Sequence, residues 1–500
     1  MKIEITKNSE KNDNLKKWFK DPYNLILIGI LLFAFGIRLY YLFLTLNQPL
    51  WWDEAEYIIK AKNIAFGTPD TGWFKYRPLF FPFLAAFFFI LGLGIVGIKI
   101  LWLLISIFGV LLVYLIGKEL FDEKISLIAT LIYSVFYLDI FYMCRLLVDM
   151  PAVVFSLLAI YFFLKREKKT FAFFIIPLII IGSMIRFSVS LTFIILFVYL
   201  FLIKGFSLLK EKNLIYSSLI GLLLLIPIFI WSVINFGGPL NLLYRLTLGG
   251  GREQGFNQFS VLMQYITYFP NYIYTILFIL FLIGLLFFYD LIFAIDLIKN
   301  KKFLQSKLLL VLWIIIPILV FGLLINHFED RYIAMIFPAV FYIIGYGLVE
   351  IASIIDKNRK LIFVLIIIIF LLVGIYPMFN YTKLIINQKI NSYIGVKEAG
   401  IWLKENSKKS DVIFGSSIPQ LTFYSERVTY GYPDNESDFN KKIEELKPRY
   451  MVLTIWEKSP LWVYSWPEKN NRSIKLVYVS FIDKENKKPD TLIYEFIQSS

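Results

Sequence analysis

The chain has 500 residues, of which 58% are hydrophobic and 18% aromatic, and its mean hydropathy of +0.68 exceeds what a soluble core needs and predicts a polytopic membrane protein. The net charge of +14 comes mostly from Lys and Arg between apolar runs, as in loops at an anionic membrane surface, so nucleic acid is not an expected partner. The single cysteine, Cys144, excludes an intrachain disulfide framework, a four-cysteine zinc site and a CxxC redox pair.

Apolar runs define the expected membrane segments. Residues 1–23 are charged and show no cleavage pattern, so we expect a cytosolic amino-terminal segment before a first helix that stays in the mature chain. About 20 apolar residues cross a bilayer as a helix. Eleven spans are predicted, at 24–46, 95–117, 125–144, 150–164, 171–186, 188–203, 214–235, 271–296, 308–326, 332–353 and 361–380. The run 78–92 is shorter and begins with Pro78 and Pro82, which predicts a helix lying in the interface.

The loop charges predict the orientation. With the amino terminus inside, the alternate loops that contain Lys118, Lys168, Lys210, Lys301 and Arg359 also fall inside, and each carries at least two cations. The outward segments are then 47–94, 145–149, the turn near Arg186, 237–270, 327–331 and the carboxyl terminus. We therefore expect a multi-pass protein of the plasma membrane.

The carboxyl-terminal part has an ordinary soluble composition. Residues 395–417 and 439–456 are each predicted to form a helix followed by a strand, and IKLVYVS and DTLIYEF two further strands. The predicted fold is mainly α: a helical membrane domain over 24–385, with a small extracytosolic α/β domain over 386–500.

Charged residues of both signs gather in the outward segments. They are Asp53 and Glu54 in LWWDEAEY, Lys75 and Arg77 before Pro78, Arg145 and Asp149 in CRLLVDM, and His327, Glu329, Asp330 and Arg331 in NHFEDRY. A carboxylate can deprotonate an acceptor hydroxyl, while Arg or Lys can hold a departing phosphate. Glycoside hydrolysis would need no fixed cations. The mixture favours moving a sugar from a lipid phosphate.

The order of these motifs resembles a known superfamily. An apolar span is followed by Asp-Glu in the first outer loop, a Pro-Leu stretch that opens an interfacial helix, GKELF before a basic turn, and RLLVDM. This order is similar to the GT-C superfamily, in its protein mannosyltransferase and aminoarabinose transferase branch, best over residues 24–165. The resemblance implies a glycosyltransferase that uses a polyprenyl-phosphate sugar donor and transfers the sugar with inversion on the outer face.

The resemblance also implies roles for single residues. Asp53 matches the catalytic base, Glu54 the adjacent acid, and Asp149 the acid near the acceptor or a metal. The family's basic residue before a double proline has no clean match in KYRPLFF, where Tyr76 or Arg77 takes its place. The phosphate ligand is therefore open between Lys75 and Arg77. His327 and Arg331 match a charged turn before a span that contains Pro338.

Each of these residues also has a structural interpretation. Glu54 suits a helix amino terminus, Asp149 can cap a helix before Pro151, and Arg145 can extend to the interface. Arg252 follows three glycines, whose backbone N–H groups are a candidate phosphate contact or a flexible loop. Asp139 lies inside a predicted span and needs a partner that the sequence does not identify. No cofactor is certain; a divalent metal ion stays open, with Asp149 and Glu54 as candidate ligands.

Two other functions compete with transfer. A lipid or solute transporter or flippase would place ionisable groups near the bilayer midplane and often shows repeated halves, whereas these charges gather at one face and no repeat is visible. A non-catalytic surface-binding protein would leave the order of acidic motifs unexplained. The sugar, the lipid chain and the acceptor, whether protein, lipid or glycan, are not identified by the sequence.

Overall fold

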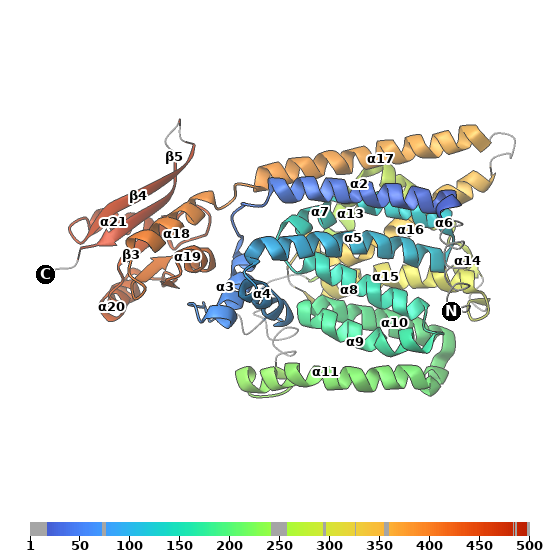
Figure 1. Cartoon of the computed structure of the whole chain (residues 1–500), viewed down its shortest axis with the longest axis horizontal. Coiled ribbons are helices and arrows are strands. Elements are labelled where there is room, and N and C mark those ends of the chain that lie inside the picture. The colour runs from blue at the N-terminus through green and yellow to red at the C-terminus, as the bar shows by residue number, and fades with distance from the viewer. Residues whose placement is uncertain are drawn as a thin grey trace, which may run out of the picture. The chain divides into compact units, whose positions relative to one another are not determined.

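The computed structural model describes residues 18–72, 77–241, 258–293, 297–325, 327–354, 360–483, 485 and 488–497, and most of them are helical (Figure 1). The chain forms two compact units. The first contains residues 1–43, 101–144 and 148–384, and the second contains 44–100, 145–147 and 385–500. Residues 47–94, expected to face outward, and the carboxyl-terminal domain therefore belong to the same unit.

Long apolar helices make up the membrane part. They are α2 (Pro22–Leu44), α5 (Gly94–Leu120), α6 (Glu123–Ser134), α7 (Tyr137–Cys144), α8 (Asp149–Leu164), α9 (Lys169–Ile185), α10 (Ser190–Lys204), α11 (Lys212–Phe236), α13 (Gln258–Leu286), α15 (Lys302–Leu324), α16 (Phe337–Ile354) and α17 (Lys360–Lys389). Short helices join them: η2 (Phe187–Val189), η3 (Gly205–Lys210), α14 (Asp290–Phe293) and η5 (Asp330–Ile336).

Each predicted span coincides with one or two of these helices. In the described part of the chain, eight helices are long and apolar enough to cross a membrane, and α6 and α7 would make a ninth, bent by 47°. The helices at predicted spans 150–164 and 171–186, α8 and α9, have only 16 and 17 residues. The fold class is confirmed, whereas crossing by these two short helices stays a prediction.

Helix α13 differs from its predicted span. It begins at Gln258 rather than near residue 271, so part of the predicted outer loop is helical. The helix is interrupted at Tyr274, where φ is +62° and ψ is 160°. This backbone conformation is strained for a residue with a side chain. Pro270, one turn earlier, cannot donate the backbone hydrogen bond that an unbroken helix would use.

A buried ion pair lies at the bend between α6 and α7. Arg38 Nη2 is 2.6 Å from Asp139 Oδ2, and Arg38 Nη1 donates to the carbonyl of Ser134 at the end of α6. Ser106 Oγ and Tyr133 OH also donate to the Asp139 carboxylate, at 2.5 and 3.0 Å. Arg38 is thus the partner that the sequence could not name, and it satisfies a backbone carbonyl that the bend releases.

Glycines allow close packing of two membrane helices. A Cβ added at Gly347 of α16 would lie 2.7 Å from Gly284 Cα of α13. No side chain fits between these backbones, so both positions require glycine. Small residues are the usual means of bringing membrane helices together, because lipid supplies no hydrophobic driving force between them.

In the second unit, α3 (Trp52–Phe66) packs against α4 (Phe80–Ile90), the short helix expected in the interface. Tyr57 and Phe81 meet between them with ring centroids 5.3 Å apart. Helix α3 ends at Gly67, whose φ of +68° is the left-handed conformation that glycine adopts without cost. This local structure carries Asp53, Glu54 and Arg77.

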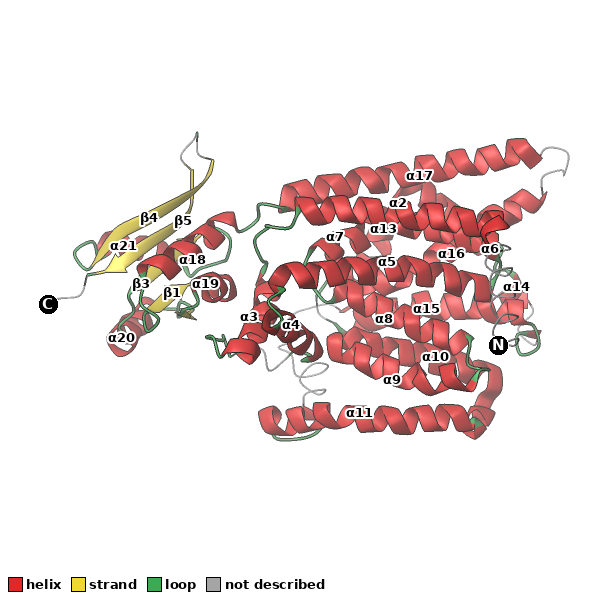
Figure 2. Ribbon diagram, in the orientation of Figure 1, coloured by secondary structure: helices red, strands yellow, loops and turns green. Residues whose placement is uncertain are grey.

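The carboxyl-terminal domain contains the predicted sheet (yellow in Figure 2). Its strands are β1 (Val412–Gly415), β2 (Val428–Tyr430), β3 (Tyr450–Thr454), β4 (Ile474–Asp483) and β5 (Lys488–Phe496), in the order β2-β1-β3-β5-β4. The first three strands are parallel, and β5 runs antiparallel to β3 and β4. Helices α18 (Ile394–Asn406), α19 (Ile418–Ser425), α20 (Glu436–Leu446) and α21 (Leu461–Lys469) accompany them. The predicted α/β character is confirmed; α19, β2 and α21 were not predicted.

Side chains of the sheet alternate between two cores. Ile413 and Val452 pack with α18 residues in one core, while Phe414 and Met451 pack with Phe439 of α20 in the other. Both faces are therefore covered, which explains why β3 is buried along its whole length. The domain has a hydrophobic core of its own, with no need of disulfides.

Candidate active site

The first charged cluster lies at the start of α3, in the second unit. Asp53 is the second residue of this helix, and Arg77 Nη2 lies 2.6 Å from Asp53 Oδ1. The Asp53 side chain is 27% exposed and that of Arg77 28%. Burial opposes the charge of Arg77, but Asp53 and Tyr57 together outweigh this effect and raise the pKa of the guanidinium. Two residues predicted from the sequence thus form an ion pair that water can reach.

Glu54, the adjacent acid, has a different environment. It is fully buried, and its carboxylate accepts the backbone N–H of Trp51 at 2.7 Å and that of Leu146 at 2.6 Å. Arg145 Nη1 lies 3.4 Å from Glu54 Oε2 and donates to the carbonyl of Pro49. These contacts tie the start of α3 to the turn at 145–147. The geometry favours a positioning role for both Glu54 and Arg145.

Glu56 is a buried acid that was not singled out as a site residue. It is 2% exposed, and Thr71 Oγ1 donates to its carboxylate at 3.0 Å. Burial raises the pKa of Glu56, although the Thr71 hydroxyl and the charge of Arg77 act in the opposite direction. Glu56 therefore links α3 to the loop that precedes α4.

The second cluster lies in the first unit and centres on Asp149, the first residue of α8. The side chain of Asp149 is 1% exposed. Arg186 Nη1 lies 2.7 Å from its Oδ1, and Arg331 Nη1 lies 3.8 Å from its Oδ2. The N-cap residue of α8 is Val148, so the carboxylate binds guanidinium groups rather than capping the helix. Asp149 thus holds two guanidinium groups at this end of the helices.

The turn at 327–331 belongs to the same cluster. Arg331 Nε lies 3.2 Å from Glu329 Oε2, and His327 Nε2 lies 3.0 Å from Glu329 Oε1. The hydroxyl of Tyr142 donates to Asp330 Oδ1 at 2.9 Å. The side chain of His327 is 68% exposed. His327 thus contacts the edge of the cluster through Glu329.

Arg186 is the residue that sequence reasoning missed. It follows α9 as the C-cap residue, in the outward turn predicted there, and its guanidinium also lies 5.4 Å from the Tyr332 ring centroid. A lone arginine between two apolar runs resembles an interfacial anchor. Its proximity to the 145–149 turn was the available signal, because both segments were expected on the same face.

Several predicted residues cannot be placed. Lys75, Tyr76 and Arg252 lie outside the described residues. In the described ranges, no group of three or more His, Cys, Asp or Glu side chains could hold a metal ion. The two metal candidates of the sequence, Asp149 and Glu54, instead contact arginine and backbone groups.

The chain is similar to a known protein family and to several solved structures. The family model described as dolichyl-phosphate-mannose-protein mannosyltransferase matches residues 76–231. No curated protein matches the chain. Among solved structures, the oligosaccharyltransferase of Archaeoglobus fulgidus in its apo form has a TM-score of 0.65 at 13% identity, over 92% of this chain and 80% of that one.

A second solved structure is equally similar. ArnT from Cupriavidus metallidurans bound to undecaprenyl phosphate has a TM-score of 0.64 at 13% identity, over 93% of this chain and 98% of that one. The archaeal oligosaccharyltransferase AglB with an inhibitory peptide and a dolichol-phosphate has a TM-score of 0.60 at 14% identity, over 88% and 70% of the two chains. The family model confirms the predicted resemblance over residues 76–231, and the solved structures show that the chain shares their fold.

Proposed function

We propose that this protein transfers a sugar from a polyprenyl-phosphate donor to an acceptor at the outer face of the plasma membrane, with inversion. The observation that carries the proposal is the water-accessible pair of Asp53 and Arg77, a base and a phosphate-binding cation 2.6 Å apart. The solved structures named above support the donor class, since one of those proteins binds undecaprenyl phosphate and another dolichol-phosphate. That this chain also binds a polyprenyl phosphate is part of the proposal.

Asp53 acts as the general base in this mechanism. The acceptor hydroxyl oxygen forms a bond to the anomeric carbon while the bond from that carbon to the donor phosphate oxygen breaks. The polyprenyl phosphate leaves with the bonding electrons, and the hydroxyl proton passes to the Asp53 carboxylate. One displacement of this kind inverts the anomeric centre. General-base catalysis contributes about 10² to 10⁴ in rate.

Arg77 links donor binding to the release of this base. Its guanidinium holds Asp53 at 2.6 Å, and a carboxylate held by a guanidinium is a weaker base. The donor phosphodiester also carries one negative charge, and its two non-bridging oxygens can accept a bidentate pair of hydrogen bonds from Arg77. When Arg77 turns to the phosphate, the Asp53 carboxylate is released from this ion pair and can accept the hydroxyl proton.

The arginines around Asp149 are proposed to bind an anion within the first unit. Asp149 and Glu329 together balance the two guanidinium charges, so an anion would bind Arg186 or Arg331 by replacing one of these carboxylate contacts. In this role Asp149 orients the arginines. Lys75 and Arg252 remain candidate donor contacts from the sequence. The amino terminus is cytosolic and residues 386–500 are extracytosolic in this proposal.

The test is transfer by the purified protein in liposomes, with polyprenyl-phosphate mannose and glucose as donors and membranes from cells lacking the gene as acceptors. Released polyprenyl phosphate is measured. Asp53→Asn should lower its release by roughly 10² to 10⁴ because the base is lost. Asp70→Asn is the matched control, since Asp70 pairs with Lys60 at 2.6 Å in the same unit and should leave transfer unchanged.

Binding of undecaprenyl phosphate is followed separately. Asp53→Asn should retain it, whereas Arg186→Ala and Arg331→Ala should each weaken it by about tenfold, the loss of a charge-assisted contact. Wild-type transfer by well-folded Asp53→Asn protein would show that Asp53 is not the base. Unchanged binding in both arginine variants would show that Arg186 and Arg331 do not bind the donor phosphate.

A further inference from the structure

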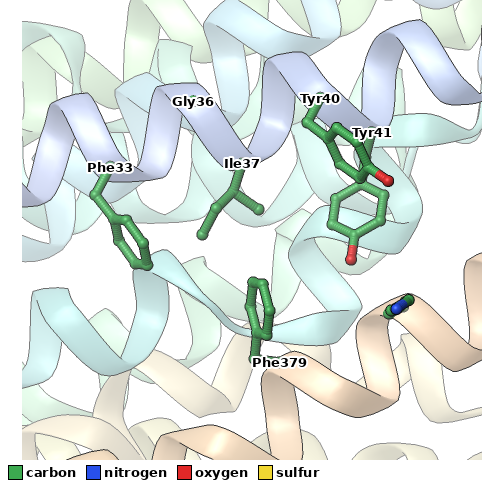
Figure 3. A pocket seen from close by; sticks show the side chains of 7 residues that line it. Phe33, Gly36, Ile37, Tyr40, Tyr41 and Phe379 are labelled. Carbon is green, nitrogen blue, oxygen red and sulfur yellow. The ribbon is translucent and has the colours of Figure 1, made fainter.

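A groove of about 510 Å³ lies between α2 and α17, within the first unit (Figure 3). It is lined by Phe33, Gly36, Ile37, Tyr40, Tyr41, Phe379 and Lys383. None of these residues belongs to the Asp149 cluster, and none was predicted as a site residue. The groove therefore requires an explanation separate from the proposed transfer.

The groove has one apolar end and one polar end. In Figure 3, Phe33 and Ile37 of α2 face Phe379 of α17, while the hydroxyls of Tyr40 and Tyr41 lie further along α2. Phe33 and Tyr40 are seven residues apart, a rise of roughly 10 Å along a helix. The lining thus changes from apolar to polar over the same direction in which a lipid changes from acyl chain to headgroup.

The lining helices expose this surface to the bilayer. Phe33 is 49% exposed, Tyr40 61% and Phe379 37%, and both helices contain membrane-spanning segments. Tyrosine is typical of the level at which hydrocarbon meets headgroups. Gly36 leaves open space, since a Cβ added there would meet no atom within 4 Å. A chain from the bilayer can therefore enter the groove beside Gly36.

Lys383 supplies the only charge in the lining. Its side chain is exposed, and no described carboxylate forms an ion pair with it. An ammonium group beside an apolar groove is complementary to a lipid with a negatively charged headgroup, because basic residues next to membrane helices attract anionic lipids. A zwitterionic lipid gains less from this contact, because its headgroup carries its own cation.

We propose that the groove binds an anionic phospholipid of the bilayer, with an acyl chain between Gly36 and Phe379 and the headgroup phosphate at Lys383. The phenol of Tyr40 lies at the same end and is placed to donate to the headgroup. Under the predicted topology this end faces the outer leaflet. The proposal concerns a bilayer lipid and does not rest on transferase activity.

The test is native mass spectrometry of the full-length protein after detergent removes its lipids, with phosphatidylglycerol, phosphatidylcholine and undecaprenyl phosphate added back singly. The wild type should bind one phosphatidylglycerol about tenfold more tightly than phosphatidylcholine, the effect of one charge-assisted contact. Lys383→Gln should abolish this preference, and Lys383→Arg should keep it.

A substitution inside the groove tests the location of the acyl chain. Gly36→Leu places a side chain in the open space and should lower phosphatidylglycerol binding by tenfold or more. Gly29→Leu is the matched control, because Gly29 is two turns earlier on α2, is equally open, and does not line the groove. An unchanged lipid preference in Lys383→Gln, or binding that Gly36→Leu and Gly29→Leu affect equally, would overturn the proposal. The wild type could instead bind undecaprenyl phosphate more tightly than phosphatidylglycerol and lose this binding in Gly36→Leu. That result would overturn the proposal and identify the carrier lipid as the ligand of the groove.

Discussion

At the scale of single residues, burial separates carboxylates that look alike in the sequence. Asp53, Glu54 and Glu56 lie within four positions, yet the Asp53 side chain is 27% exposed and the two glutamates are almost fully buried. Glu54 accepts backbone N–H groups, and Glu56 accepts a hydroxyl. Only Asp53 combines exposure with a cationic partner, so it is the acid best placed to exchange a proton with a substrate.

The buried state of Glu56 predicts a pH-dependent stability. Because burial raises the folded-state pKa above the unfolded value of about 4.3, the folded protein binds more protons. The stabilising contribution of Glu56 is complete below the unfolded pKa and is lost as the pH rises through the folded pKa. Glu56→Gln cannot ionise and should melt at a higher temperature than the wild type at pH 7.5, with the difference vanishing near pH 4.

Thermal unfolding of the full-length protein in detergent, at both pH values, measures this difference. Glu54→Gln serves as the contrasting variant, since it weakens the contact with Arg145 and should lower the melting temperature at pH 7.5. A Glu56→Gln melting temperature at or below that of the wild type at pH 7.5 would show that the carboxylate is not disfavoured in its site.

Site residues could be predicted where their neighbours in the sequence already indicate their environment. Asp53 and Asp149 follow apolar runs and Arg77 precedes one, all in segments expected to face outward, and that placement already favours a polar environment. Arg186 and Asp149 are separated by α8 and α9, and Arg38 and Asp139 by 101 positions, so no short motif could pair them. The structural role of Glu54 was also hidden, because its partner N–H at Leu146 lies 92 positions away.

At the scale of elements, helix length decided what the sequence could predict. Runs of about 20 apolar residues identified the long helices, but α19, β2 and α21 have only 8, 3 and 9 residues, too few for a clear periodicity. The break between α6 and α7 was missed for another reason. No Pro or Gly marks residues 135 and 136, and the released carbonyl of Ser134 is satisfied by a distant Arg38.

The end of α20 offers a test of one element. Lys447 caps this helix with φ of +45° and ψ of 58°, the left-handed conformation that costs a residue with a Cβ about 1 kcal/mol or more. Lys447→Gly removes the Cβ and should stabilise the helix by about 0.5–1 kcal/mol. Hydrogen exchange of peptides that cover residues 436–454, in the full-length protein, should slow accordingly.

Lys447→Ala separates conformation from charge in that experiment. Alanine removes the lysine charge and keeps the Cβ, so its exchange should match the wild type. If Lys447→Ala protects α20 as much as Lys447→Gly does, the gain comes from removing the charge and the conformational argument fails.

At the scale of the whole molecule, the two units join segments that the sequence keeps far apart. Residues 44–100, the 145–147 turn and the carboxyl-terminal domain form one unit, in which Lys62 of α3 pairs with Glu426 after α19 at 2.6 Å. The hydroxyl of Tyr424 accepts the backbone N–H of Leu50 in the same unit. The domain over 386–500 thus shares a unit with the loop that carries Asp53, which lies more than 300 positions away in the sequence.

The orientation of the protein in the membrane can be predicted from the charges of its short loops. Short loops rich in Lys and Arg stay in the cytosol, so positions 168 and 301 should be inside and the carboxyl-terminal domain outside. Single cysteines at Lys168, Lys301 and the exposed Glu445, each in a Cys144→Ser background, test this in whole cells. An impermeant maleimide should label only Glu445→Cys, and all three variants should react once the membrane is permeabilised. Labelling of Lys301→Cys from outside would contradict the predicted topology. The same count of spans assigned Asp53 and Asp149 to the outer face, so their assignment would fail with it.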